Sequence, residues 1–222
     1  MKVNAPAAKM PSLTELKNDC LDLHLKNKIV LITGASRGIG ETTAKLFALH
    51  GAKVIINYQN SKTQAEAIVN EINNAGGEAL AMQADIANEL QVKTMIKTIY
   101  EKFSNIDILI NNASGSFMPK SFLDLSWNEF QEDIDITVKG TFNCCQQVLP
   151  LMIKNGGGKI INLSSVAVEI PPAMQSKYVT AKSALVGLTR SLAVEFAKHN
   201  IQINLVEPGL VLTDLTQHLN PV

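Results

Sequence analysis

The chain has 222 residues, of which 46% are hydrophobic, and its 20 Lys and Arg balance its 20 Asp and Glu to a formal net charge of zero. This length can bury one large core, and the neutral charge excludes the strongly basic footprint of a nucleic-acid-binding protein. No apolar run approaches the roughly 18–20 residues of a membrane span. We therefore expect no nucleic-acid partner, no membrane partner and, with only Cys20, Cys144 and Cys145, neither a disulfide framework nor a metal site.

Residues 1–24 are rich in Ala and Pro as far as Leu16, and they lack the apolar core of a signal peptide. We predict that they form a mobile extension of a cytoplasmic protein, followed by a single domain over residues 25–222. The adjacent Cys144 and Cys145 fall within a predicted helix, where we expect buried small thiols in a reducing compartment.

The apolar run 29–32 predicts a strand, and it is followed by a glycine-rich turn and an amphipathic helix over 41–50. A strand, a glycine turn and a helix are the context of a dinucleotide phosphate site, where the helix start favours an anion. Glycines permit a tight turn, close approach of a pyrophosphate and close packing of helix and strand. The spacing Gly-x-x-x-Gly-x-Gly also fits a plain turn, so other motifs must support the assignment. The turn reads Thr33-Gly34-Ala35-Ser36-Arg37-Gly38-Ile39-Gly40.

Strands and helices alternate along the rest of the chain. Because the apolar strands show no alternation of polar and apolar residues, we expect helices on both faces of the sheet. Right-handed crossovers then predict an α/β fold, a Rossmann-like doubly wound parallel sheet with strand order 3-2-1-4-5-6. The pattern predicts strands at 53–56, 78–83, 106–110, 159–163 and 201–206; helices at 61–75, 88–103 (apolar side Leu90, Met95, Ile96, Ile99), 126–153 and 176–199; and capping boxes Ser61/Gln64 and Ser126/Glu129.

Ligands of such sheets collect beyond the carboxyl ends of the strands. Each of the polar segments at these ends could be a local cap or turn, but five of them at one edge predict a ligand crevice. They are the glycine turn, Asp85-Ile86, Asn111-Asn112-Ala113-Ser114, Ser164-Ser165 and Pro208-Gly209.

Tyr178 and Lys182 are four residues apart and therefore share one face of a predicted helix. A nearby ammonium favours the phenolate and lowers the pKa of the tyrosine. Such a phenol can protonate a carbonyl oxygen that is being reduced, or accept the proton of an alcohol. Ser165 could donate a hydrogen bond to the same oxygen. A Tyr-x-x-x-Lys pair alone is weak evidence, so its context decides.

Together these motifs, from Lys28 to about Leu215, resemble the classical short-chain dehydrogenases/reductases, and in particular the members similar to 3-oxoacyl reductases. The resemblance implies that Tyr178 is the catalytic acid/base, that Ser165 orients the substrate oxygen, and that Lys182 binds the nicotinamide ribose and lowers the pKa of Tyr178. It further implies contacts of Asp85 and Ile86 with adenine, of Asn112 and Ala113 with the adenosine ribose side, and of Pro208, Gly209, Val211 and Thr213 with the nicotinamide.

Three features depart from the family pattern. Ser114 stands where the family has glycine, which adds bulk near the cofactor and disfavours positive φ. Thr137 stands where the family has a fourth catalytic residue, an asparagine. The family also continues beyond Val222 through a substrate-covering segment and a seventh strand, which we expect to be missing here.

The predicted second strand ends at Asn57-Tyr58-Gln59-Asn60 without a carboxylate that would bind both hydroxyls of an NAD ribose and repel a 2′-phosphate. Arg37 in the glycine turn could meet that phosphate, although it could also be a solvated loop cation. We therefore expect NADP(H) to be preferred over NAD(H).

The sequence thus predicts an NADPH-dependent oxidoreductase that reduces a ketone or 3-oxoacyl-type carbonyl to an alcohol, or catalyses the reverse. The alternative is a catalytically weak or inactive nucleotide-binding relative that serves as a scaffold or sensor. We also expect a homodimer or larger assembly, because two long helices are apolar beyond one stripe, unless these residues pack only within the subunit. They are Phe142, Val148 and Leu151 in one helix and Leu185, Leu188, Leu192 and Val194 in the other.

Overall fold

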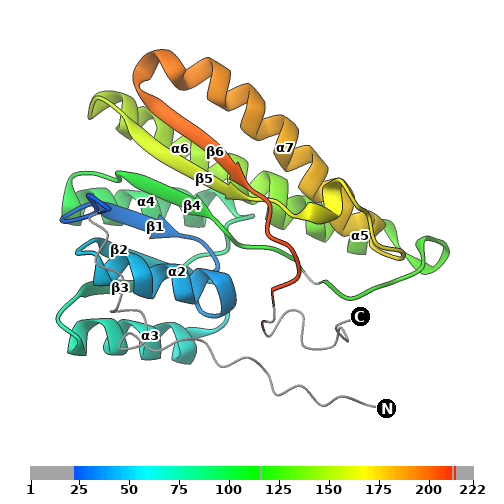
Figure 1. The fold of residues 1–222 in the computed structure, drawn as a ribbon, viewed down its shortest axis with the longest axis horizontal. Coiled ribbons are helices and arrows are strands. Elements are labelled where there is room, and N and C mark those ends of the chain that lie inside the picture. The colour runs from blue at the N-terminus through cyan, green and yellow to red at the C-terminus, as the bar shows by residue number, and fades with distance from the viewer. Residues whose placement is uncertain (1–22, 116, 212, 214–222) are drawn as a thin grey trace.

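The computed structural model describes residues 23–115, 117–211 and 213. In this part of the chain six parallel strands form one sheet in the order β3-β2-β1-β4-β5-β6, as the sequence predicts (Figure 1). The strands are β1 (Ile29–Ile32), β2 (Lys53–Tyr58), β3 (Glu78–Gln83), β4 (Ile108–Asn111), β5 (Gly158–Leu163) and β6 (Ile201–Val206).

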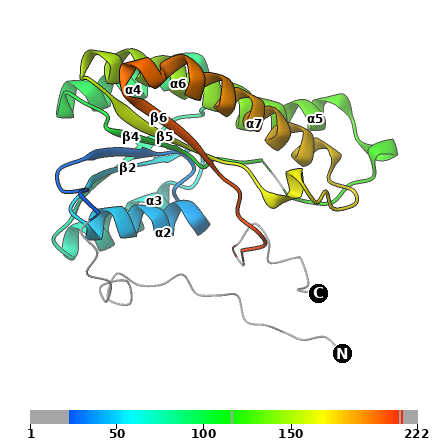
Figure 2. The same ribbon diagram turned by 45° about the horizontal axis from the view of Figure 1, so that its top comes forward.

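Helices cover both faces of the sheet, and Figure 2 shows the two helical layers on opposite sides of it. Side chains of α2 and α3 pack with the apolar residues on one face, and side chains of α4, α6 and α7 pack on the other. Burial on both faces explains why the strands read as apolar runs without alternation. The helices are α2 (Gly38–Leu49), α3 (Lys62–Asn74), α4 (Glu89–Phe103), α5 (Trp127–Ile134), α6 (Gly140–Lys154) and α7 (Ser176–Phe196).

The helix predicted over 126–153 is interrupted, and this prediction is wrong in its middle. α5 gives way to a π-helical segment over Asp135–Lys139, and α6 follows from Gly140. Gly140 lies so close to the loop after β3 that a Cβ would come within 2.5 Å of Ile86 Cδ1. This close approach is a tertiary constraint, which helical periodicity does not report.

Other local predictions met mixed outcomes. The capping box of Ser126 and Glu129 is confirmed, whereas the Ser61 side chain makes no capping hydrogen bond because its backbone, with ψ of 60°, leaves the usual cap conformation. Leu90, expected on the apolar side of its helix, is 71% exposed in the first turn of α4.

Cys144 and Cys145 are buried as expected, and burial raises the pKa of the Cys145 thiol to about 12. The proposed extension lies almost wholly outside the described residues.

A chain of buried amides ties the sheet to α7. Asn111 at the end of β4 donates a hydrogen bond from Nδ2 to Asn162 Oδ1 on β5 over 2.8 Å. Asn162 in turn donates to Thr189 Oγ1 on α7, also over 2.8 Å. Buried polar groups that satisfy one another fix a unique arrangement. This series of hydrogen bonds therefore holds α7 against β4 and β5.

Within residues 23–115, 117–211 and 213, no helix combines the length and apolarity needed to cross a bilayer. In the same residues no three His, Cys, Asp or Glu side chains gather where they could hold a metal ion.

Candidate active site

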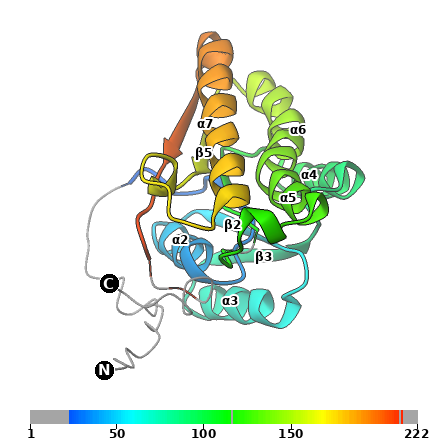
Figure 3. The same cartoon turned by 90° about the vertical axis from the view of Figure 1, so that its right-hand side faces the viewer.

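A cleft of about 610 Å³ opens at the carboxyl edge of the sheet. This volume is in the range of small-molecule and cofactor sites. Figure 3 shows the two helical layers flanking this region, with α7 on one side and α2 on the other. Its lining includes every residue predicted for catalysis or cofactor binding except Gly40, namely Gly34, Ser36, Arg37, Gly38, Ile39, Asp85, Ile86, Asn112, Ala113, Ser165, Tyr178, Lys182, Pro208, Gly209, Val211 and Thr213.

The glycine turn after β1 requires its glycines. Gly34 and Gly38 have φ of 61° and 60°, a region that side chains disfavour. A Cβ at Gly34 would also come within 2.8 Å of Ala113 Cα. Gly40 does not line the cleft, and a Cβ there would come within 2.6 Å of Asn112 Nδ2. Gly40 therefore serves the close packing of helix and loop.

The start of α2 is open toward the cleft. Arg37 is the N-cap residue, its backbone is extended, and its side chain makes no capping hydrogen bond. The first N–H groups of a helix have no partner within the helix and, with the helix dipole, favour an anion. An uncapped helix start beside two positive-φ glycines thus fits a phosphate group.

The end of β2 supplies amide and hydroxyl groups to the cleft and no carboxylate. Asn57 is only 2% exposed. Its Oδ1 accepts a hydrogen bond from Gly34 N over 3.4 Å, and its Nδ2 donates to the Ala84 carbonyl over 3.0 Å. Because its side chain joins the end of β2 to the glycine turn and to the segment after β3, Asn57 has a structural role at this part of the cleft.

Tyr178 and Lys182 are buried side by side on α7, with Lys182 Nζ 5.7 Å from the centroid of the Tyr178 ring. Lys182 Nζ donates a hydrogen bond to the Leu163 carbonyl over 2.6 Å. Burial lowers the pKa of Lys182 to about 8, and the negative charge of Asp133 partly opposes this shift. Lys182 therefore loses its proton at a lower pH than an exposed lysine does, and its ammonium form still prevails at neutral pH.

The pKa of Tyr178 is raised, contrary to the expected lowering by Lys182. Burial is the main cause, a hydrogen bond with the Ser165 side chain opposes it, and the charge of Asp133 adds to it. Burial removes the phenolate from water and so disfavours it. The Tyr-x-x-x-Lys pattern of the sequence does not report this burial. Ser165 thus lies beside the Tyr178 hydroxyl. Ser164 is instead buried, and its hydroxyl donates to the Lys182 carbonyl over 3.4 Å.

The two substitutions relative to the family pattern have different consequences. Ser114 is not among the described residues with positive φ, so serine causes no backbone strain there. Thr137 is 2% exposed and lies within the π-helical segment, where its side chain offers a hydroxyl in place of a carboxamide.

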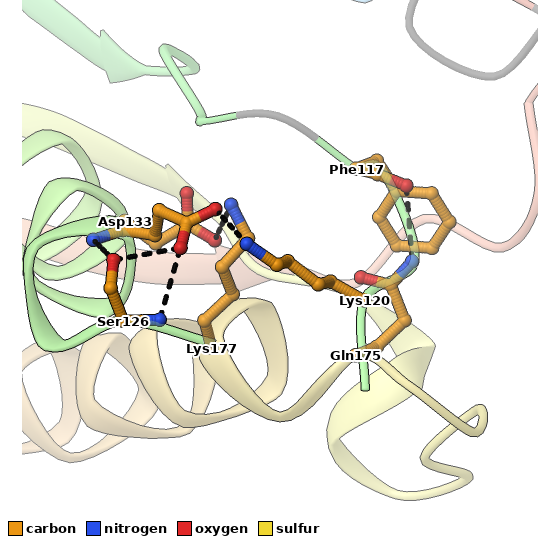
Figure 4. Close-up of polar contacts among 7 residues, drawn as sticks. Phe117, Lys120, Ser126, Asp133, Gln175 and Lys177 are labelled. Atoms are coloured by element: carbon orange, nitrogen blue, oxygen red, sulfur yellow. Dashed lines mark hydrogen bonds and ion pairs between the residues drawn. The ribbon is translucent and has the colours of Figure 1, made fainter. Parts of the chain in front are cut away.

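Sequence reasoning missed a group of residues around the start of α7. Phe117 contacts the Tyr178 ring edge-on, with centroids 4.7 Å apart, and its carbonyl accepts a hydrogen bond from Gln175 Nε2. Asp133 of α5 lies 3.6 Å from Lys177 Nζ of α7. Figure 4 shows these polar contacts near the start of α7. Asp133 is one of several acids in the stretch Glu132-Asp133-Ile134-Asp135, so nothing in the sequence marks it as the buried one.

A parallel Rossmann-like sheet, a glycine turn after its first strand and a buried Tyr-Lys pair at the same edge define the class of dinucleotide-dependent oxidoreductases. The model of the short chain dehydrogenase family matches residues 28–221. The chain belongs to this family and is an NAD(P)-dependent oxidoreductase.

Similar proteins are reductases. The chain is 43% identical over 196 residues to a 3-oxoacyl-(acyl-carrier-protein) reductase of Synechocystis. The aligned region covers 88% of this chain and 79% of that protein. It is 41% identical to the FabG reductase of Staphylococcus aureus strain Mu50, over 87% of this chain and 78% of that protein.

The chain also resembles solved structures. A 3-ketoacyl-(acyl-carrier-protein) reductase of Brucella melitensis, complexed with NADH, matches with a TM-score of 0.81 and 33% identity over 86% of this chain and 79% of that one. A short chain dehydrogenase of Burkholderia cenocepacia, in complex with NADP, matches with a TM-score of 0.81 and 35% sequence identity. The match covers 86% of this chain and 77% of that one.

Proposed function

We propose that this protein reduces a ketone or 3-oxoacyl-type carbonyl with NADPH, or catalyses the reverse oxidation. The observation that carries the proposal is the convergence of Ser165, Tyr178 and Lys182 on one cleft with the glycine turn. The names of the similar reductases support the substrate class, and the NADH and NADP complexes of two of the similar structures support the cofactor class.

The residues present fit a dinucleotide. The uncapped start of α2 and the positive-φ glycines would hold its phosphates, and Arg37 would meet a 2′-phosphate. Asp85 and Ile86 would contact the adenine, and Asn112 and Ala113 the adenosine ribose. The nicotinamide half would lie among Tyr178, Lys182, Pro208, Gly209, Val211 and Thr213, which line the other part of the cleft.

The catalytic residues would act on the carbonyl oxygen. When bound, the reduced nicotinamide supplies a hydride to the carbonyl carbon. Tyr178 donates its phenolic proton to the oxygen, and Ser165 orients that oxygen by a hydrogen bond. Lys182 stabilises the phenolate that remains and holds the ribose. The raised pKa of Tyr178 keeps this proton donor protonated at neutral pH, which suits reduction.

We expect NADPH to bind at least about tenfold more tightly than NADH, or about 1.4 kcal/mol, because a charge-assisted phosphate contact can supply this much. Arg37→Ala is expected to remove most of the difference. Titration of both cofactors by nicotinamide fluorescence measures it.

Arg190 provides a matched control, since it is the only other arginine of the chain and lies exposed on α7. Arg190→Ala is expected to leave the cofactor preference intact. Equal dissociation constants for NADPH and NADH in the unmodified protein would contradict the proposed preference.

The alternative function is that of a nucleotide-binding relative with little or no catalysis. Thr137 is the observation that favours it, because the family places an asparagine there. Such a protein would bind NADPH with the same preference and would leave it unoxidised with every carbonyl offered.

We further propose that two copies associate through α6 and α7. Phe142 on α6 is 48% exposed and Val194 on α7 is 83% exposed, so both apolar side chains lie at the surface of the subunit. Pairing of these helices about a two-fold axis would bury them in a self-complementary interface.

Light scattering at micromolar concentration is expected to give at least twice the subunit mass of 24.1 kDa. A Phe142→Glu, Val194→Glu double variant should shift the mass toward the single subunit. Leu90→Glu, which alters an exposed leucine on α4, is the control and should leave the mass unchanged. A subunit-sized species in the unmodified protein would contradict the association.

A further inference from the structure

Phe117, in the segment between β4 and α5, lies against the ring of Tyr178. The two ring centroids are 4.7 Å apart, and the ring planes are nearly perpendicular, at 84°. The charge distribution of aromatic rings favours such edge-to-face pairs. Both residues also line the cleft. Phe117 therefore restricts the ring of the residue that we propose as the proton donor.

Gln175 holds the backbone of Phe117 in place. It is 2% exposed and lies at the start of α7, on the same helix as Tyr178. Its Nε2 donates a hydrogen bond to the Phe117 carbonyl over 3.0 Å. Figure 4 shows the Gln175 amide directed toward this carbonyl. Because a carbonyl oxygen can only accept, this bond decides which end of the amide faces Phe117.

The other end of the Gln175 amide is unfavourably placed. Its Oε1 is buried and accepts no hydrogen bond from any residue that the structure describes. An unpaired buried polar atom destabilises a fold, whereas an apolar side chain of similar length would leave none. Packing alone therefore does not account for glutamine here. The hydrogen bond to Phe117 does.

The segments that carry Phe117 and Gln175 meet a second time. Lys120 N donates a hydrogen bond to the Met174 carbonyl over 2.9 Å. Met174 immediately precedes Gln175 and has φ of 62°, a region that non-glycine residues rarely adopt. Strained backbone persists where the surrounding structure holds it. Two hydrogen bonds thus tie residues 117–120 to the corner from which α7 begins.

We propose that Phe117 and Gln175 are positioning residues for catalysis: Gln175 holds the Phe117 carbonyl, and the Phe117 ring thereby sets the orientation of the Tyr178 ring. A hydrogen bond with the Ser165 side chain also restrains the Tyr178 hydroxyl, but a bond to one atom leaves the ring free to tilt about it. The inference rests on the proposed carbonyl reduction, in which Tyr178 must point its proton at the substrate oxygen.

Gln175→Met is expected to separate activity from stability. Methionine retains the length and the apolar contacts of the side chain, donates no hydrogen bond and removes the unpaired Oε1. The melting temperature should therefore be unchanged or higher, and NADPH should bind with unchanged affinity. The value of kcat should fall about three- to tenfold, the range that one aromatic edge contact can supply.

Phe117→Leu removes the ring, keeps an apolar side chain and should lower kcat by a similar factor. Phe117→Tyr retains the ring and should keep kcat near its original value. The double variant of Gln175→Met and Phe117→Leu should lose no more than Phe117→Leu alone, because Gln175 acts through the Phe117 ring. Losses that multiply in the double variant would show that the two residues act independently, which contradicts the inference.

Two residues of α5 provide matched controls, because they make the same kinds of contact outside the cleft lining. Gln131 Nε2 donates a hydrogen bond to Asp135 Oδ1 over 2.9 Å. Phe130 stacks on Trp127 with centroids 5.5 Å apart. Gln131→Met and Phe130→Leu should each leave kcat unchanged.

Nuclear magnetic resonance of ring-labelled tyrosine tests the positioning without any turnover. The chain has three tyrosines, so Tyr178→Phe identifies the signal of Tyr178. The ring current of Phe117 displaces this signal, and Phe117→Leu should move it. Gln175→Met should move it in the same direction, and should move it no further once residue 117 is leucine. The two α5 controls should leave it in place.

The two readouts separate this inference from the proposed function. If Gln175→Met leaves either the Tyr178 signal or the kcat of an active enzyme at its original value, the inference is wrong. If the signal moves as expected while the unmodified protein reduces no carbonyl, the proposed function alone is overturned.

Discussion

Tyr178→Phe is expected to lower kcat for carbonyl reduction by about 100-fold or more, the usual contribution of a general acid. Phenylalanine retains the edge-on contact with Phe117 and the packing of α7, so NADPH should bind with nearly unchanged affinity. The loss should appear in kcat and in kcat/KM alike, because the proton is transferred only as the transition state forms. Steady-state kinetics and cofactor titration measure the two quantities.

Tyr100→Phe is the control for the loss of a phenol. Tyr100 lies on α4 outside the cleft, where its hydroxyl accepts a hydrogen bond from Lys154 over 2.9 Å. This variant should keep its activity. Near-native turnover of Tyr178→Phe would show that another group protonates the carbonyl oxygen.

Lys182→Met is expected to abolish most catalysis and yet to stabilise the cofactor-free fold. The pKa of Lys182 falls from 10.5 in the unfolded chain to about 8 in the fold, because burial penalises the ammonium. Below pH 8 both states carry the charge, so the folded state bears the full penalty. Between pH 8 and 10.5 the folded lysine is neutral while the unfolded one still binds a proton, so stability rises with pH. Above both values the penalty is gone.

The gain in unfolding free energy is therefore largest near pH 7, at about 1–3 kcal/mol, and should shrink toward pH 10. Chemical denaturation at the two pH values tests this. Lys45→Met is the opposing control. Burial disfavours the Lys45 ammonium, but ion pairs with Glu41 and Glu71 at 2.8 and 2.7 Å together outweigh burial and raise its pKa. Its loss should destabilise the fold. A Lys182→Met protein less stable than the original at pH 7 would show that the hydrogen bond to Leu163 outweighs desolvation.

The sheet could be predicted because its signals are local. Three predicted strands, Ile29–Ile32, Glu78–Gln83 and Ile201–Val206, have the observed bounds. β4 begins at Ile108 rather than at residue 106, and β2 continues to Tyr58 because its pairing with β3 extends that far. The parallel order follows from the handedness of the crossovers, which does not depend on exact strand ends.

The cleft could be predicted because motif residues follow strand ends, and a parallel sheet brings strand ends together. The electrostatics of the site could not. The pKa of Tyr178 is raised mainly by burial and further by the charge of Asp133, a residue 45 positions earlier in the sequence. Nothing in the sequence distinguishes Gly140 from other glycines of helices, because the requirement for glycine comes from Ile86, which lies against it only in the fold.

Hydride transfer is the central claim, and isotope labelling tests it most directly. NADPH dideuterated at C4 of the nicotinamide is incubated with the protein and a 3-oxoacyl thioester, and the product is analysed by mass spectrometry. The expected result is a 3-hydroxyacyl thioester with one deuterium on C3, formed by the unmodified protein and strongly diminished with Tyr178→Phe. An unlabelled product, or no product with any ketone offered although NADPH binds, would contradict carbonyl reduction by this site.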